Sequence, residues 1–329
     1  MTIRVCTYNV EWFAKLFDKN DQPLTKSKCK KRLSAIKTVL TTIDADLLGI
    51  VEAPNTNTTT GRPSTTKALV NLAAAENLRL DKAIIGFPSA GRQELALWYD
   101  SSKLSIRHDP GGSPKSQSTP PFDKPFQQDT DEDRIKEIYE HYRPPLEAKV
   151  KVLGGAEFYV LLVHAKSKGI FRAVDLVRLQ RESERNRRKL LAEAFSIRRR
   201  VDDWLDAGRD FLVMGDVNDG PGMDFYEQFF GRSALEIIMG DVFQPDRILR
   251  NLAGRPRWGN FGWRPSSARF RDRITEDHVN VLIDHMLHSP SLKASGHRIW
   301  NPFQLKEAKP IKKELLDASD HFPVSLDLY

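Results

Sequence analysis

A strand pattern that ends in two closely spaced polar residues is the first sign of chemistry in this chain. Residues 211–214 are consecutive apolar residues, and Asp216 and Asn218 follow them. Such a run is typical of a strand covered on both faces, and residues i and i+2 of an extended chain point the same way. A carboxylate at the end of a buried strand needs a charged or hydrogen-bonding partner. The simpler interpretation is a polar turn after a core strand, since Gly-Pro-Gly at 220–222 predicts a turn.

The same arrangement recurs at other predicted strands, and an Asp-His pair precedes the last one. These strands are predicted at 3–13, 46–51, 158–163, 279–283 and 324–328. The polar residues at their ends are Asn9, Glu11, Glu52, His164, Lys166, Lys168, Asp284, Asp320 and His321. In layered α/β folds such ends gather at one edge of the sheets. We therefore expect these side chains, with Asp216 and Asn218, to form one site.

The mixture of side chains at these ends favours a hard cation. Several carboxylates would repel one another in a structural core, whereas Mg²⁺ takes one or two carboxylates together with waters and phosphate oxygens. No cysteine belongs to the group, which makes a zinc site a weaker interpretation.

Helices must alternate with these strands to hold them in place. Helical patterns in the sequence predict helices at 26–43, 67–76, 173–207 and 224–230. A further strand is predicted at 95–99. No pattern marks a second core, so we expect one domain over residues 1–329. The Pro-, Gln- and Asp-rich segment around 108–145 is predicted to be a surface insertion, with a helix at 131–141.

Composition places the chain among globular proteins. It has 329 residues, of which 40% are hydrophobic and 29% charged, with no apolar run long enough to span a membrane and no secretory signal pattern. Cys6 and Cys29 are its two cysteines. So few cysteines do not suggest a disulfide framework, and we expect a reducing cytoplasm as the location of the protein. A secreted form whose signal has been removed is the alternative. The net charge of +7 favours a polyanion such as nucleic acid as the binding partner, and no membrane partner is expected.

Two segments are rich in basic residues, and each has two interpretations. The predicted helix at 173–207 carries many arginines, which either bind nucleic acid or form a solvated outer face. We favour the solvated face, because it is the usual pattern of a helix that packs on a sheet. The region 247–273 mixes arginines with aromatic residues such as Trp263. It either contacts phosphates and bases or packs down as a long loop.

The ordered motifs resemble those of the endonuclease/exonuclease/phosphatase superfamily, which includes deoxyribonuclease I, apurinic endonucleases, sphingomyelinases and inositol polyphosphate phosphatases. The resemblance spans the chain from residue 3 to its end, and 164–169 is similar to a motif of a bacterial nuclease branch. It rests on Tyr8-Asn9-Val10-Glu11, Glu52, Gly215-Asp216-Val217-Asn218, Ile283-Asp284 and Ser319-Asp320-His321. The implied fold is a four-layer α/β/β/α sandwich of two mixed sheets flanked by helices.

The resemblance also implies a reaction, the metal-assisted attack of water on the phosphorus of a phosphodiester. Mg²⁺, with Mn²⁺ as a substitute, would be held mainly by Glu52. The other expected metal ligands are Asn9, Glu11 and Asp320.

The remaining motif residues take catalytic and binding roles by the same resemblance. Asp216 would position and deprotonate the water, and Asn218 would hold a phosphoryl oxygen. Asp284 would orient His321, which would contact the phosphate or assist the water, while His164 would serve the leaving group. The expected substrate-binding residues are Lys166, Lys168 and Trp263. His285 is predicted to point away from Asp284 and to pack.

Three functions follow, in order of preference. The first is a nuclease that acts on DNA, with RNA as a second substrate, and it rests on the net charge, on 164–169 and on the basic aromatic region. The second is a phosphohydrolase of a small or lipid head-group phosphoester. The third is a binding module without activity, which the complete set of motif residues disfavours.

Overall fold

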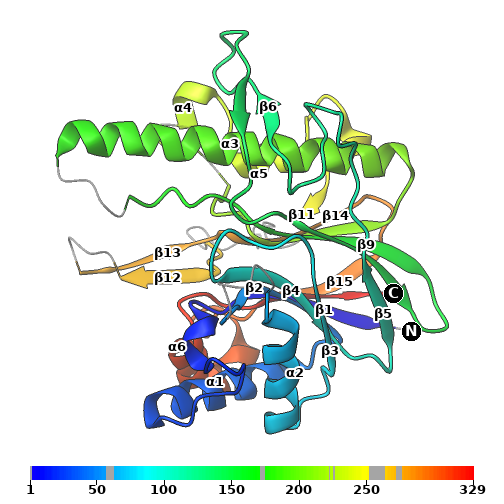
Figure 1. Ribbon diagram of the computed structural model, residues 1–329, viewed down its shortest axis with the longest axis vertical. Helices are drawn as coiled ribbons and strands as arrows, with labels where there is room; N and C mark the ends of the chain where they lie inside the picture. Colours follow the sequence, from blue (N-terminus) through cyan, green and yellow to red (C-terminus); the bar gives the residue numbers. More distant parts are fainter. Residues whose placement is uncertain are drawn as a thin grey trace.

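Two six-stranded sheets stack face to face, with helices on both outer faces (Figure 1). The structure is a computed structural model that describes residues 2–56, 63–170, 175–221, 223–224, 227–251, 264–271 and 276–329. The four layers confirm the α/β/β/α sandwich expected from the sequence.

The first sheet contains both ends of the chain. Its strands, in spatial order, are β15 (Ala294–Ile299), β16 (Val324–Leu328), β1 (Ile3–Asn9), β2 (Leu47–Pro54), β4 (Gln93–Tyr99) and β3 (Lys82–Ile85). The β1–β2 pair is parallel and the other pairs are antiparallel. The sheet is therefore mixed.

The second sheet has the same character. Its strands, in spatial order, are β11 (Arg250–Asn251), β14 (Asp284–His288), β10 (Phe211–Asp216), β9 (Glu157–His164), β8 (Leu146–Val152) and β5 (Leu104–His108). Here β9 and β10 form the parallel pair.

The helices divide between the two outer faces. The first sheet is covered by α1 (Ser27–Ile43), α2 (Thr65–Glu76) and α6 (Lys312–Ala318), with the short helices η1 (Phe13–Leu16) and η3 (Lys306–Ile311) nearby. The second is covered by α3 (Leu176–Asp206) and α5 (Ala234–Met239), and the chain beside them also forms α4 (Glu227–Phe230) and η2 (Pro245–Arg247).

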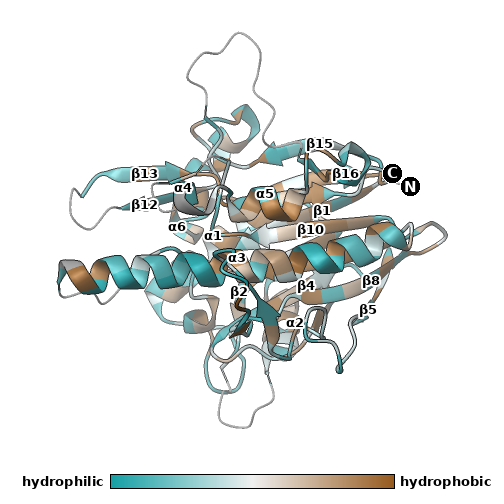
Figure 2. Ribbon diagram, turned by 90° about the horizontal axis from the view of Figure 1, so that it is seen from above, coloured by the Kyte–Doolittle hydropathy of each residue, from teal (hydrophilic) through white to brown (hydrophobic). Residues whose placement is uncertain are grey.

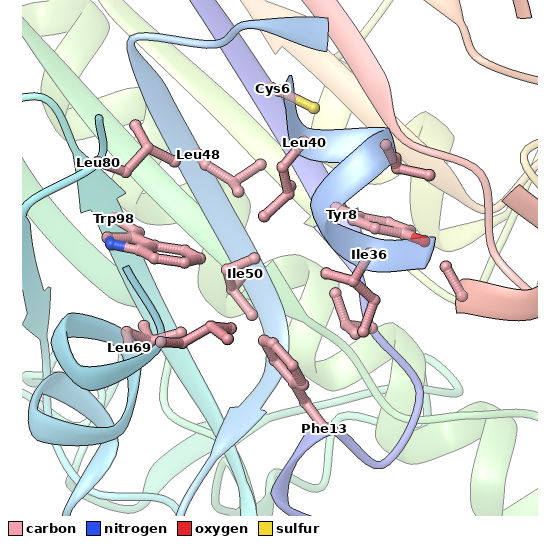
Figure 3. Close-up of a cluster of buried hydrophobic side chains, with 14 of the residues drawn as sticks. Cys6, Tyr8, Phe13, Ile36, Leu40, Leu48, Ile50, Leu69, Leu80 and Trp98 are labelled. Atoms are coloured by element: carbon pink, nitrogen blue, oxygen red, sulfur yellow. The ribbon is translucent and has the colours of Figure 1, made fainter. Parts of the chain in front are cut away.

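Three apolar clusters hold the layers together. In α1, Leu33, Ile36, Leu40 and Ile43 recur at helical spacing, and all four are buried. This face packs on the first sheet, where Figure 3 shows Ile36 and Leu40 beside residues such as Tyr8 and Ile50. A second cluster fills the space between the sheets, and a third lies between the second sheet and α3 with α5.

The predicted helix at 131–141 is wrong. This part of the chain forms a two-stranded hairpin, β6 (Phe126–Gln128) with β7 (Glu137–Tyr139). The Asp129 carboxylate accepts hydrogen bonds from the backbone N–H groups of Asp131, Glu132 and Arg134. Such side-chain bonds compete with helical ones, and Glu132 and Arg134 have positive φ angles of 64° and 70°.

The predicted strand at 279–283 is also corrected. Its first part belongs to an outlying hairpin, β12 (Ala268–Arg271) with β13 (His278–Val281), whose β13 residues are largely exposed. The buried strand is β14, and Asp284 begins it instead of following it. The short helix predicted from 224 begins only at Glu227. Within the described ranges, no helix is long and apolar enough to cross a lipid bilayer.

Candidate functional site

The carboxyl ends of four strands meet at one end of the stacked sheets. The parallel pairs β1–β2 and β9–β10 end near Asn9, Glu52, His164 and Asp216. A hydrogen bond from Asn9 Nδ2 to Asp216 Oδ2, 3.0 Å long, joins the two sheets at this point. The structure thus brings together side chains that are up to 207 residues apart in the sequence.

An Asp-His pair completes this end of the second sheet. Asp284 lies opposite Asp216 in the register of β10 and β14, and its Oδ2 accepts from His321 Nδ1 at 2.8 Å. The hydroxyl of Ser267 donates to the same oxygen at 2.8 Å. His321 Nε2 then lies 3.5 Å from Asn9 Nδ2 and 4.0 Å from Asp216 Oδ2.

Charges around the imidazole decide its protonation. Burial alone would lower the pKa of His321, but the carboxylates of Asp284, Asp216 and Asp320 outweigh burial and raise it to about 10. The ring is therefore a cation at neutral pH. Since Nδ1–H donates to Asp284, Nε2–H is left to face the site.

The pKa of Asp216 is also raised, but for a carboxyl group this shift favours the neutral form. Burial, followed by the charge of Asp284, raises the pKa of Asp216 to about 7, although His321 and two hydrogen bonds favour its charged form. Its Oδ1 accepts from the backbone N–H of Asn218 at 2.8 Å. A carboxyl group that titrates near neutrality can accept a proton from water and release it again.

A second group of acids lies beside the first. Glu52 sits in a β-bulge between Val51 and Ala53 with a φ of 60°, and its Oε2 accepts from the backbone N–H of Trp12 at 2.7 Å. Burial raises the pKa of Glu11, and the charges of Asp320 and Glu52 raise it further. Burial also raises the pKa of Asp320. The bulge thus turns Glu52 toward other acids.

The donors at this end fit a hard cation. Among the described residues that form this site, Asn9 Oδ1, Asp284 Oδ1 and Asp320 Oδ1 are buried and have no hydrogen-bond partner. One atom each of Asp216, Asp284 and His321 lies within 4.8 Å of the others. Because the imidazole is protonated, the two carboxylates are the members of this group that could bind an ion. Carboxylate and amide oxygens are the ligands that Mg²⁺ prefers. The assignment of the ion to Asn9, Glu11, Glu52 and Asp320 stays a prediction.

His164 lies on the other side of Asp216. Its Nε2 is 3.7 Å from Asp216 Oδ2, and its Nδ1 has no partner among the described residues. Burial, aided by the charges of Arg143 and His321, holds the pKa of His164 well below its usual value. The ring is therefore neutral and keeps one N–H that it can donate.

The two lysines predicted to bind substrate are placed differently. Lys168 Nζ is held by Asp219 Oδ1 at 2.6 Å, by Glu227, and by Asp224 at 3.6 Å. These carboxylates occupy its ammonium group, so the structure does not favour the predicted phosphate contact. Lys166 Nζ bonds only to the backbone oxygen of Ser167 among the described residues, at 3.2 Å. Trp263 lies outside the described residues.

Asp219 is a structural residue that the sequence did not single out. Its Oδ2 accepts from the backbone N–H of Ala234 at 2.6 Å, at the start of α5, and its backbone oxygen lies 2.8 Å from His285 Nε2. His285 is fully buried, which confirms the packing role predicted for it.

Arg143 is the main site residue that the sequence did not reveal. Its Nη1 donates to Gln93 Oε1 at 3.0 Å and its Nη2 to the backbone oxygen of Ala165 at 3.2 Å. The same oxygen accepts from Asn218 Nδ2 at 3.0 Å. Arg143 belongs to the segment interpreted as a surface insertion. Its position shortly before β8 is the sequence feature that could have identified it as a site residue.

Two further residues fix the loops that carry the acids. Ser319 Oγ donates to the backbone oxygen of Asn9 at 2.8 Å and accepts from the N–H groups of Glu11 and His321. Arg32, from α1, donates to the backbone oxygens of Glu11 and Ala318. Both hold the loop after β1 against the loop before β16.

Comparisons with known proteins agree with this geometry. The model of the Endonuclease/Exonuclease/phosphatase family matches residues 6–321. No curated protein sequence matches the chain significantly.

Several solved structures share the fold. An endonuclease/exonuclease/phosphatase from Bacteroides vulgatus has 17% identity and a TM-score of 0.54, covering 100% of this chain and 99% of its own. The human Nocturnin catalytic domain with bound sulfate anion has 14% identity and a TM-score of 0.52, with coverage of 100% and 94%. ANGEL2, a 2′,3′-cyclic phosphatase, has 11% identity and a TM-score of 0.52, with coverage of 99% and 95%.

Proposed function

Because this chain belongs to the endonuclease/exonuclease/phosphatase family, we propose that it is a Mg²⁺-dependent nuclease that hydrolyses the phosphodiester bonds of DNA or RNA. The observation that carries the proposal is the meeting of the Asp284–His321 pair with Asp216 and Asn9 across the two sheets. This arrangement sets a cation, a titratable carboxyl and unpaired oxygens side by side.

Each side chain has a step that suits its protonation state. Asp216 accepts a proton from the attacking water, since its pKa of about 7 leaves part of it ionised at neutral pH. The water oxygen forms the new bond to phosphorus, and the bond to the leaving alkoxide breaks. His321 donates Nε2–H to a phosphoryl oxygen, where charge develops. Asn218 supports the same phosphoryl group without adding negative charge.

The leaving group and the ion complete the scheme. His164, neutral and with one N–H, stabilises the leaving oxygen. Glu52 would hold the ion together with Asn9, Glu11 and Asp320, and Mn²⁺ would substitute for Mg²⁺. When bound, the ion neutralises charge on the phosphoryl oxygens. Arg143 and Lys166 add positive charge beside the phosphate.

We also propose that the chain forms one catalytic domain. In support, the segment around 108–145 packs on α3 through His141 Nε2 and Ser196 Oγ, 3.1 Å apart, and it supplies Arg143 to the site.

A panel of substrates tests the function. Plasmid DNA, single-stranded DNA, RNA and bis(p-nitrophenyl) phosphate are each incubated with Mg²⁺ or Mn²⁺, and in parallel with EDTA. We expect cleavage of at least one nucleic acid that EDTA abolishes. Release from small phosphoesters without cleavage of any nucleic acid would support the alternative, a phosphohydrolase of small or lipid head-group phosphoesters. No metal-dependent hydrolysis at all would overturn the proposal.

A further inference from the structure

The cations of α3 fall into two groups that differ in their partners. On the faces turned to the fold, the arginines are paired: Arg187 with Asp224, Arg188 with Asp131, Arg198 with Asp202 and Arg200 with Glu147. These pairs give four of the eight arginines of α3 a structural role, which differs from the solvated face favoured by the sequence.

The second group is a stripe on α3 that starts beside the site. It consists of Lys189, Arg185, Arg181 and Arg178, spaced by three or four residues, and we call it the α3 stripe. Residues at this spacing share one face of a helix. From residue 189 to residue 178 the stripe is about 16 Å long, at 1.5 Å per residue.

The loop after β9 places the stripe next to the site. The backbone N–H of Lys166 donates to Glu193 Oε2 on α3 at 2.7 Å, and the oxygen of Gly169 accepts from Asn186 Nδ2 at 3.0 Å. The loop therefore runs along α3 toward its N-terminus. Lys189 lies one turn before Glu193, so it follows Lys166 in the direction away from His164.

Positive charge accumulates here around the buried carboxylate of Glu193. Among the described residues, neither Lys166 nor Lys189 forms an ion pair. Burial and then the charge of Arg143 lower the pKa of Lys166, the charge of Glu193 raises it, and the charges of Lys189 and Arg185 lower it further. These cations therefore act on one another. The buried Nε of Arg143 has no hydrogen-bond partner among the described residues. Arg185 reaches Glu182 at 2.6 Å and Arg178 reaches Asp175 at 3.5 Å, but these arginine side chains are 72% and 68% exposed. Such surface pairs contribute little.

The stripe continues beyond the sheets. In Figures 1 and 2 the N-terminal part of α3 projects past the end of the sheets where the site lies, in the same direction as the β12–β13 hairpin, and Figure 2 colours much of it as hydrophilic. An extended molecule bound along this stripe would leave the site in the direction of the projecting helix.

We propose that the α3 stripe, together with Lys166, binds the phosphates of a nucleic acid strand that extends from the phosphate being cleaved. The proposal rests on the proposed function and narrows it to an extended substrate. Each strand of a duplex has one phosphate per 3.4 Å of helix axis. The stripe is therefore long enough for several consecutive phosphates spread over about 16 Å, which a small phosphoester does not span. DNA and RNA share this backbone chemistry.

The test compares Arg185→Gln/Lys189→Gln with the wild type. Its control, Lys309→Gln/Lys313→Gln, removes the same charge from the opposite outer layer. Binding of fluorescein-labelled single-stranded DNA and RNA 12-mers is followed by anisotropy in EDTA as the NaCl concentration rises. Each lost contact to a single strand should reduce the slope of log K against log salt by about 0.7. We expect a slope shallower by about 1.4 in the stripe variant alone, with an unchanged melting temperature.

Catalytic activity provides a second test of the α3 stripe. The ratio of kcat/KM for a 12-mer to that for bis(p-nitrophenyl) phosphate should fall at least tenfold in the stripe variant and stay constant in the control. An unchanged slope in the stripe variant, or an equal change in the control, would refute the proposed binding of phosphates by the α3 stripe. Equal loss on both substrates would also overturn it, since it would mark a structural role. If the wild type hydrolyses nothing, the proposed function fails, while the binding slope still decides the stripe. The DNA and RNA arms show which strand is preferred.

Discussion

At the scale of single residues, the site works by keeping two neighbouring groups in different protonation states. His321 is held as a cation by the carboxylates around it, while burial makes Asp216 a weak acid. Asp284 contributes to both shifts, because its charge raises the pKa of each group. One carboxylate thus affects the protonation of both His321, the proposed donor, and Asp216, the proposed acceptor.

This leads to a prediction for Asp284→Asn, which keeps the shape and the acceptor oxygen but removes the charge. The pKa of His321 should fall from about 10, because burial then has less opposition, and the pKa of Asp216 should fall from about 7. Both limbs of the pH profile of kcat/KM should move to lower pH. When the profile is measured between pH 5 and 10, we expect the midpoint of the alkaline limb to shift to lower pH by at least one unit. An alkaline limb at the wild-type position would refute the cationic role of His321.

At the scale of elements, the site depends on how closely β9 and β10 approach. Gly215 has a φ of 130°, and a Cβ there would lie 2.1 Å from the backbone oxygen of Val163. A side chain would push apart the two strands that carry His164 and Asp216.

We predict that Gly215→Ala destabilises the protein by on the order of 3 kcal/mol or more, from overpacking together with backbone strain. Gly208→Ala is the matched control, since Gly208 also has a positive φ, 63°, but open space around it. Its cost should be about 1–2 kcal/mol, the strain alone. Urea unfolding measures both. Equal free energies of unfolding for the two variants would contradict the close approach of the strands.

The segment around 108–145 provides a second element-scale prediction. His141 packs edge-on against Phe122 at 5.2 Å, and burial, with the charges of Lys189 and Arg199, lowers its pKa to about 3. A folded-state pKa below the unfolded value of 6.5 means that stability is fully present above pH 6.5 and declines as the pH falls toward 3. His141→Phe removes this proton.

Between pH 7 and pH 5, the wild type should therefore lose on the order of 1–2 kcal/mol more free energy of unfolding than His141→Phe. Urea titrations at the two pH values give this difference. An equal loss in both proteins would show that His141 takes up its proton in the folded state as well.

The comparison of sequence and structure also belongs to this scale. Residue types and their order predicted several central strands, the long helices and the meeting of Asn9, Asp216, Asp284 and His321, and the family resemblance implied the two sheets. Local side-chain bonding at Asp129 overrode the helical pattern at 131–141. Arg143 and the partners of Lys168 depend on contacts between distant segments, which spacing along one chain does not encode.

At the scale of the whole molecule, the two sheets are halves of one site. The first sheet supplies Asn9 and Glu52, the second supplies His164, Asp216 and Asp284, and the loop before β16 supplies Asp320 and His321. The α3 stripe would extend this site across the outer layer. The central claim is that the acids at this end hold a divalent cation for the hydrolysis of a phosphodiester.

The most direct measurement is the rate of oligonucleotide cleavage against Mg²⁺ concentration for the wild type and Glu52→Gln. Glutamine keeps the size of the side chain and an oxygen that can accept from Trp12, so the fold and melting temperature should be retained. We predict a saturable Mg²⁺ dependence for the wild type and a loss of roughly 10²-fold or more in the variant, as expected when charge stabilisation is lost. Cleavage by Glu52→Gln at near the wild-type rate and Mg²⁺ dependence would contradict the account.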